Sequence, residues 1–308
     1  MATRAATVGA AGIRRRRIRY GEIVVKVLLG LCALISVATT VGIVVALFVP
    51  AYEFFQDVPL KDFLTGKEWA PLFEPALFGV LPLVVGTLSV TLWAILVAIP
   101  FGLGAAIYLS EYASPRMRKV LKPLLEILAG VPTIVYGYFA LTFFTPLLQD
   151  IGIKVDIFNA LSAGLVMGVM ILPTVASLAE DAMTAVPRDL RDGALALGSP
   201  NRVVATRIVV PAAISGIIAA FVLGISRAVG ETMIAVVAAG QQPNLTFDPR
   251  QAVETMSAFI AATGAGDVPT GSLEYKTIFA VGATLFVMTL ILNIISIRFV
   301  DRFREEYE

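Results

Sequence analysis

The chain has 308 residues, of which 57% are hydrophobic and only 15% are charged, and its formal net charge is +1. Soluble domains carry roughly 25% charged residues, so the composition excludes an ordinary globular protein and favours several membrane-spanning helices. The sequence contains no histidine and a single cysteine, Cys32, which excludes histidine-based triads, histidine metal sites and an internal disulfide.

Residues 1–22 are small, polar and basic, and we expect them to form a cytoplasmic tail. The tail could bind nucleic acid, but the apolar run that follows favours anchoring at the membrane surface instead. That run, 23–50, is too long for a signal-peptide core of about 7–15 residues, so we interpret it as a first transmembrane anchor helix. The clustered arginines of the tail are Arg14, Arg15, Arg16, Arg17 and Arg19.

A polar stretch at 51–77 predicts an external loop. Within it, Gly66 and Lys67 lack the remaining residues of a phosphate-cradling loop, so no ATP or other cofactor is expected in this chain. Residues 78–300 predict a core of five helices with a long loop at 185–202, and 301–308 predict a second cytoplasmic tail. The apolar runs of the core are 80–109, 124–148, 157–178, 208–239 and 277–299.

These runs predict the fold class. Each can cross a hydrocarbon layer of about 30 Å as a helix, and backbone groups that face lipid need partners within their own segment. We therefore predict an all-α polytopic membrane bundle of six transmembrane helices. Lysine and arginine predict its orientation, because 17 of them lie near the termini and in the 110–123 and 180–207 connections, against 5 in the opposite connections. Both ends of the chain are thus expected in the cytoplasm.

Proline and glycine within the spans predict irregular packing. Pro100, Pro132 and Pro173 should kink their helices. Gly164 and Gly168 form a G-x-x-x-G pattern, which lets a neighbouring helix approach closely, although glycine is also simply common in membrane helices.

Segment 187–200 has the pattern of two short helices that meet at a sharp corner. Pro187 suits the first position of a helix, and Asp189 suits its positively polarised first turn. Gly198 suits a left-handed cap at the end of that helix, and Ser199-Pro200 suits the start of the next one.

One apolar face is expected on the first of these two helices, formed by Leu190, Ala194 and Leu197. That face could rest on the bilayer as part of an amphipathic helix, or it could insert into a partner protein. The residues alone favour neither interpretation.

The same segment resembles the cytoplasmic signature of permease subunits in bacterial ABC importers: E-A-A, three residues, glycine, nine residues, then I-x-L-P. This chain has Asp192-Gly193-Ala194, Gly198 and Ile208-Val209-Val210-Pro211 at that spacing. Three substitutions depart from the signature, and Gly193 weakens the helix by about 1 kcal/mol relative to alanine. The resemblance implies a type I importer permease whose 187–200 loop is a coupling helix docked into a separate ATPase. The residues to which it assigns that coupling are Leu190, Asp192, Gly193, Ala194, Leu197 and Gly198.

A narrower resemblance, to the PstC-type permeases of phosphate importers, covers most of the chain beyond residue 80. It is carried by GAAIYLSEY at 104–112, GVPTIVYG at 130–137 and RAVGETM at 227–233. The resemblance implies a non-catalytic subunit of the bacterial plasma membrane that forms half of a phosphate translocation pathway. The implied partners are a homologous PstA-type permease, two PstB-type ATPase subunits that bind the ATP, an external PstS-type phosphate-binding protein and membrane lipids.

Arg227 and Glu231 are charged residues inside the fifth predicted span. A lone charge at mid-bilayer costs about 2.5–3.5 kcal/mol, so the two side chains should pair or face a polar cavity. Four residues apart, they should share one helical face. They could form a static salt bridge, or they could line a pathway in which the arginine meets phosphate oxygens with forked hydrogen bonds. In the second case Glu231 would hold Arg227 until the anion competes for it.

Other polar residues have simpler expected uses. Glu126 should reach the lipid headgroups, and Glu180 and Asp181 should be solvated at the end of the fourth span. Tyr136 and Tyr138 favour interior packing over a hydroxyl that faces substrate.

Four rival functions stay open from the sequence. The chain could be a permease for another oxyanion, such as sulfate or molybdate, or the paralogous PstA-type subunit. It could belong to a different class, as an ion channel or secondary carrier, which would need no ATPase. A membrane enzyme lacks any nucleophile or metal cluster to support it.

Overall fold

The computed structural model describes residues 20–303, and the arginine cluster of the predicted tail lies outside this range. The chain divides into two compact units, residues 1–46 and 47–308. In the first unit, the described residues belong to helix α1 (Tyr20–Asp57), which buries none of its apolar side chains there. An apolar, fully exposed helix of this kind suits a lipid environment.

Helix α1 is longer than the anchor expected at 23–50, because it continues through Pro50 to Asp57. Beyond the proline, Ala51 and Phe54 are almost fully buried in the second unit. Their burial offsets the hydrogen bond that a proline removes from a helix interior, and the expected external loop therefore starts later than predicted.

Four described helices are long and apolar enough to cross a membrane unbroken: those over Gly21–Asp57, Leu81–Tyr112, Ala160–Thr184 and Leu273–Arg298. Two further pairs of helices pass the same test only together, with bends of 87° and 72°. The described part of the chain thus has four spans, or up to six if each bent pair is one span. The orientation of the termini stays a prediction.

Besides α1, the candidate spans are α3 (Leu81–Ile107), which continues into η1 (Tyr108–Tyr112), α7 (Ala160–Thr184), α13 (Leu273–Phe303) and the two bent pairs. The first pair joins α4 (Pro115–Gly130) to α5 (Thr133–Phe139), and the second leads into α11 (Ile214–Val229). The shorter helices are α2 (Leu60–Thr65), α6 (Thr145–Asp150), α8 (Arg188–Ala196), α9 (Asn201–Val204), α10 (Val210–Ala212) and α12 (Met256–Gly264). The π-helical turns are η1 (Tyr108–Tyr112), η2 (Ala140–Phe144), η3 (Ala205–Val209) and η4 (Ala235–Ala239).

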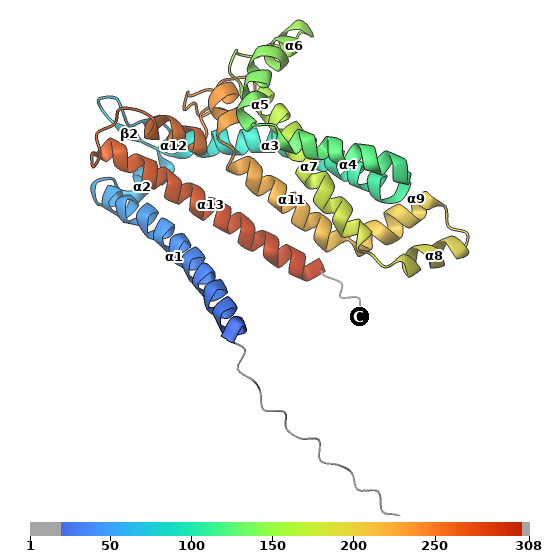
Figure 1. Cartoon of the computed structure of the whole chain (residues 1–308). Coiled ribbons are helices and arrows are strands. Elements are labelled where there is room, and N and C mark those ends of the chain that lie inside the picture. Colours follow the sequence, from blue (N-terminus) through green and yellow to red (C-terminus); the bar gives the residue numbers. More distant parts are fainter. Residues whose placement is uncertain (1–19, 304–308) are drawn as a thin grey trace, which may run out of the picture. The chain divides into compact units, whose positions relative to one another are not determined.

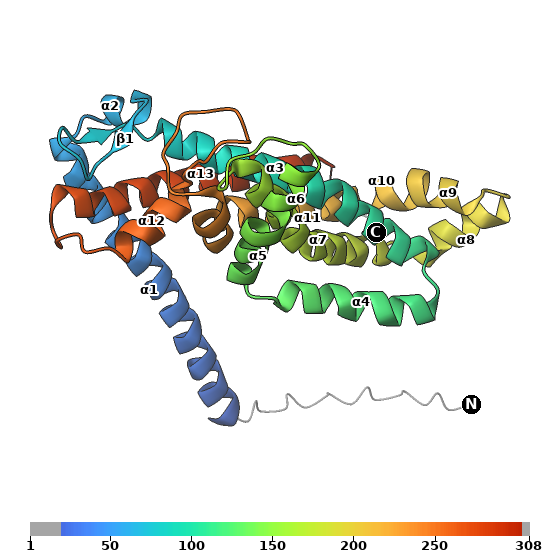
Figure 2. The same cartoon turned by 90° about the horizontal axis from the view of Figure 1, so that it is seen from above.

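Helices α3 and α7 form the central contact of the second unit, and α11 packs beside them (Figure 1, Figure 2). A Cβ atom on Gly164 would lie 2.5 Å from Cβ of Trp93, and one on Gly168 would lie 2.6 Å from the carbonyl oxygen of Ala94. Both glycines therefore mark a true close approach of two helices, as the G-x-x-x-G pattern predicts.

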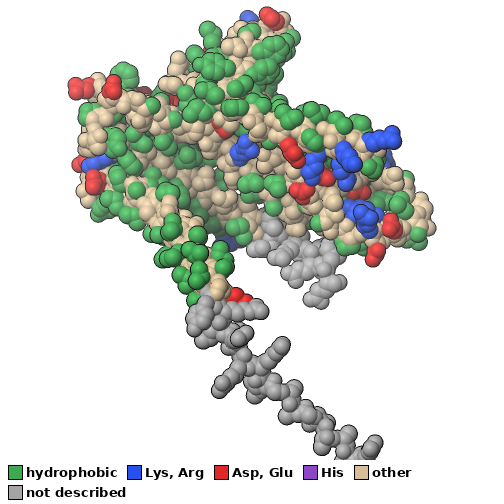
Figure 3. Space-filling model, viewed as in Figure 1, with side chains coloured by type: hydrophobic (Ala, Val, Ile, Leu, Met, Phe, Trp, Pro, Cys, Tyr) green, Lys and Arg blue, Asp and Glu red, His purple; other side chains and the backbone are tan. Residues whose placement is uncertain are grey.

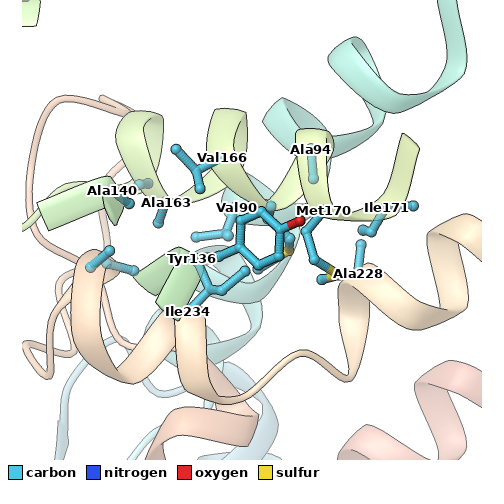
Figure 4. Close-up of a cluster of buried hydrophobic side chains, with 14 of the residues drawn as sticks. Val90, Ala94, Tyr136, Ala140, Ala163, Val166, Met170, Ile171, Ala228 and Ile234 are labelled. Atoms are coloured by element: carbon cyan, nitrogen blue, oxygen red, sulfur yellow. The ribbon is translucent and has the colours of Figure 1, made fainter. Parts of the chain in front are cut away.

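Tyr136 lies within a buried cluster formed by these helices, with its ring among Val90, Met170 and Ile234 (Figure 4). Its hydroxyl donates to the carbonyl oxygen of Leu128, 2.7 Å away. The phenol is thus an interior packing residue with a satisfied hydroxyl, which confirms the favoured interpretation for Tyr136. Interior packing is wrong for Tyr138, whose side chain is 56% exposed.

Pro132 lies at the 87° bend between α4 and α5, as expected. Helices α3 and α7 continue through Pro100 and Pro173, and kinks at these two positions stay predictions. The 72° bend at Ala213 was not predicted. It follows Pro211, whose missing N–H weakens the helix at that point.

At one end of the second unit, called here the α12 end, α2 and α12 pack with a hairpin of strands β1 (Trp69–Ala70) and β2 (Leu77–Phe78). The strands are antiparallel, with Trp69 opposite Phe78. This hairpin is a small exception to the predicted all-α architecture. The opposite end, called the α8 end, carries α8 and α9 (Figure 1).

Candidate functional site

The predicted corner at 187–200 is present at the α8 end. Helix α8 begins at Arg188, one residue after Pro187, and Gly198 has the left-handed φ of +80° that the corner requires. The backbone N–H groups of Gly198 and Ser199 donate to the carbonyl oxygens of Leu195 and Ala194, respectively. These bonds cap the C-terminus of α8. The next helix, α9, begins at Asn201 with Pro200 as its cap.

The exposed residues of this corner are not quite the predicted face. Leu197 is 89% exposed and Leu190 is 38% exposed. Ala194 is only 8% exposed and packs in a buried cluster with Val204 and Met183. Ala194 therefore packs α8 against the rest of the chain. Leu197 follows the helix, at the corner closed by Gly198, and points to the exterior. Asp192, Gly193 and Gly198 are exposed.

Sequence reasoning missed Arg191, whose side chain connects α8 to two other elements. It forms an ion pair with Glu111 of η1 at 3.2 Å, and both side chains are largely buried, at 17% and 8% exposure. It also donates to the carbonyl oxygens of Met183 and Val186, at 2.7 and 2.6 Å. These carbonyls lie at the end of α7, where a cation is favoured.

A second polar clamp joins α4 to α7. Lys122 contacts Glu180 at 2.8 Å and Asp181 at 3.2 Å, and the Glu180 side chain is only 4% exposed. The expectation that Glu180 is a solvated charge is therefore wrong. Its burial is tolerated because Lys122 and, at 3.8 Å, Arg118 neutralise it. Lysine, arginine and acidic side chains accordingly gather at the α8 end (Figure 3).

The expected helical neighbours Arg227 and Glu231 are separated by a break in the helix. Helix α11 ends at Val229 with Gly230 as its cap, so the two residues do not share a continuous helical face. Among the described residues no ion pair joins them. Arg227 donates to the hydroxyl of Thr174 on α7 at 2.9 Å. The Glu231 carboxylate accepts from the backbone N–H groups of Met233 and Ile234, as a capping residue does.

A cavity of about 330 Å³ runs along α7 between the Thr174 partner of Arg227 and the Lys122–Glu180 clamp. Both members of the clamp and Thr174 line it, together with Glu126. Arg227 reaches the wall of this largely apolar cavity only through its hydrogen bond to Thr174. No cluster of metal-ligating residues occurs within the described chain.

Glu254, at the α12 end, is a second residue that the sequence did not single out. Glu254 is only 6% exposed, and burial raises the pKa of its carboxyl to about 7. The carbonyl oxygen of Glu254 lies against Gly86 of α3, and the neighbouring Met256 N–H donates to Thr87. The segment around Glu254 is therefore fixed to α3, and the Glu254 carboxyl has no cationic partner among the described residues.

Comparisons with known proteins give a family and several relatives for this chain. Residues 98–306 match the family described as the binding-protein-dependent transport system inner membrane component. A probable ABC transporter permease protein, YqgH of Bacillus subtilis, is 33% identical over 94% of both chains. The phosphate transport system permease protein PstC of Mesorhizobium japonicum is 31% identical over 89% of this chain and 85% of its own.

A solved structure shows the same fold. It is the bacterial alginate ABC transporter in complex with an alginate-bound periplasmic protein. The match has a TM-score of 0.62 at 15% identity and covers 90% of this chain and 95% of that one. At this identity the likeness concerns architecture alone.

Proposed function

The chain belongs to the family of binding-protein-dependent transport system inner membrane components, and we propose that it is the PstC-type permease of an ATP-driven phosphate importer. Permease subunits of this kind are non-catalytic, and ATP hydrolysis belongs to a separate subunit. The chain would supply half of the pathway, in the bacterial plasma membrane.

One observation carries the proposal: an exposed, capped corner on α8 that the same chain ties firmly to its spans. Leu197 and Leu190 project from it and are available for contact with a partner protein. The proposed partner is a PstB-type ATPase subunit on the cytoplasmic side. A PstA-type permease would complete the pathway, and an external PstS-type protein would deliver phosphate.

The choice of phosphate rests on Arg227 and on the relatives named as phosphate permeases. Arg227 is half-buried, donates to Thr174 at the wall of the cavity and has no carboxylate partner among the described residues. Its guanidinium can therefore meet a dianion with forked hydrogen bonds. Glu231 would act from the other side of the helix break, as a neighbouring charge that keeps anion binding weak enough for release.

Phosphate uptake into vesicles that contain the assembled complex tests this assignment. We expect Arg227→Lys to slow uptake by roughly tenfold or more, because lysine loses the forked geometry. Glu231→Gln should alter the apparent affinity for phosphate, since a neighbouring carboxylate repels the anion. The control is Lys119→Arg, on the exposed surface of α4. Normal uptake in both pathway variants, at unchanged protein level, would leave these residues a packing role only.

Another oxyanion is the nearest rival, because the name of the Bacillus subtilis relative specifies no substrate. Competition by sulfate and molybdate at equal concentration separates the cases. Uptake that continues without any ATPase partner would instead favour a channel or a secondary carrier.

A further inference from the structure

Helix α8 has few ways to hold a fixed orientation by itself. It has 9 residues, and helices shorter than about 12–15 residues are marginal without tertiary packing. Only Ala194 of the helix is buried, and a methyl group buries little apolar area. The backbone at both of its ends is non-helical, at Pro187 and at Gly198.

Arg191 supplies the missing attachment. Its guanidinium reaches the η1 carboxylate of Glu111 and two carbonyls at the end of α7. Since η1 continues α3, this one side chain joins α8 to both helices of the central α3–α7 contact. The ion pair is shielded from water on both sides, where its directionality and strength are greatest.

Glu111 is positioned from its other side as well. The hydroxyl of Ser110 donates to it at 2.7 Å, and Arg118 of α4 donates to the carbonyl of Ser110 at 3.1 Å. The attachment point is therefore itself fixed to α4, which the Lys122–Glu180 clamp holds on α7.

We propose that Arg191 is the positioning residue through which force on α8 reaches α3 and α7, so that the corner and the spans move as one body. This inference rests on the proposed function for the origin of the force. Leu190 and Leu197 would contact the ATPase, and Arg191 would pass the displacement on. Without the guanidinium, the ATPase would still bind but would turn α8 about its two non-helical ends.

Phosphate transported per ATP hydrolysed, in vesicles with the assembled complex, is the first test. Arg191→Lys keeps the charge but cannot reach three acceptors at once. The double variant Arg191→Met with Glu111→Gln removes the pair without leaving a buried unpaired charge. We expect the ratio to fall about fivefold or more in both, as for loss of a typical coupling interaction, while the complex still co-purifies. Lys119→Arg, exposed on α4 without a bond to any described residue, should keep the normal ratio.

A second measurement needs no substrate and therefore separates failure of this inference from failure of the proposed function. Spin labels at exposed Leu195 of α8 and exposed Leu96 of α3, in a Cys32→Ser background, report the distance between the two elements. The chain with Arg191 in place should give one narrow distribution of distances between the two labels. Both Arg191 variants should give a broad distribution. Narrow distributions in both variants, or an unchanged transport ratio in an assembled complex, would overturn the proposal.

Discussion

The α12 end and the α8 end of the second unit are stabilised by different interactions. At the α12 end, aromatic rings pack edge to face, as in the pairs Phe54–Phe63 and Trp69–Phe259. At the α8 end the buried side chains are aliphatic, and ion pairs and charged hydrogen bonds also join the elements. Apolar packing is strong but non-directional, whereas charged hydrogen bonds fix an orientation. The difference suits a rigid α12 end, called here the platform, and an α8 end that transmits force in a fixed direction, called here the lever.

Buried carboxylates show the same contrast. Glu111 and Glu180, at the α8 end, are each paired with a cation. Glu254, at the α12 end, is almost fully buried without one. A paired carboxylate can stay ionised and transmit direction, whereas an unpaired one is more stable when protonated.

The largest expected effect on stability comes from Phe63→Ala, which opens a cavity among the rings of the α12 end. A buried phenylalanine truncated to alanine typically costs 3–5 kcal/mol. Thermal unfolding in detergent measures the loss, and phosphate transported per ATP by the folded fraction should stay normal. Phe73→Ala, at a side chain 73% exposed in the same segment, is the control. A transport ratio that falls with Phe63→Ala would blur the division into platform and lever.

Glu254→Gln should stabilise the chain in a pH-dependent way. Because burial raises the pKa of this carboxyl to about 7, its contribution to stability is complete below the unfolded pKa and is lost as pH rises through 7. The variant should therefore unfold like the wild type near pH 4.5 and be more stable by about 3 kcal/mol near pH 8. Denaturant unfolding at both values measures this, with the exposed Glu68→Gln as control. An equal difference in the free energy of unfolding between variant and wild type at both pH values would refute the claim that this carboxyl is buried without a cationic partner.

Between the two ends, Gly168→Ala tests the α3–α7 contact. The added methyl group would meet the carbonyl oxygen of Ala94 at 2.6 Å, and overpacking of this kind costs about 1–3 kcal/mol. Gly104→Ala, in α3 with nothing within 4 Å of the new atom, should stabilise the helix slightly. A loss of equal size in both variants would mean that close approach is not what requires glycine at 168.

The smallest expected change is Gly198→Ala at the corner. Alanine in the left-handed conformation costs about 1–2 kcal/mol, which should loosen the end of α8. Gly193→Ala, inside the same helix at an open position, should instead stabilise it by about 1 kcal/mol. Hydrogen exchange of the α8 amides would separate the two: faster with Gly198→Ala and slower with Gly193→Ala. The same direction in both would show that the positive φ is not the requirement.

Local patterns in the sequence were enough for much of this architecture. The apolar runs located the four unbroken helices that are long enough to cross a membrane, Gly164 and Gly168 marked a helix contact, and Gly198 marked the corner. Each of these features follows from residues close together in the chain, whose spacing has a direct steric consequence.

Long-range partners were not predictable in the same way. Glu111 and Arg191 lie 80 residues apart, and nothing in either local sequence identifies the other. The break between Arg227 and Glu231 was missed because spacing alone assumes a continuous helix. Burial of Glu180 and Glu254 likewise depends on which helices pack against them, and a single sequence does not contain that information.

The central claim is that this chain moves phosphate by force received at α8, and ATP-driven phosphate uptake tests it most directly. Vesicles with the complete complex should accumulate phosphate only with ATP, should stop when vanadate is added, and should lose uptake when residues 187–200 are deleted from an otherwise assembled complex. Uptake at its usual rate after that deletion, or in the absence of the ATPase subunits, would contradict the account.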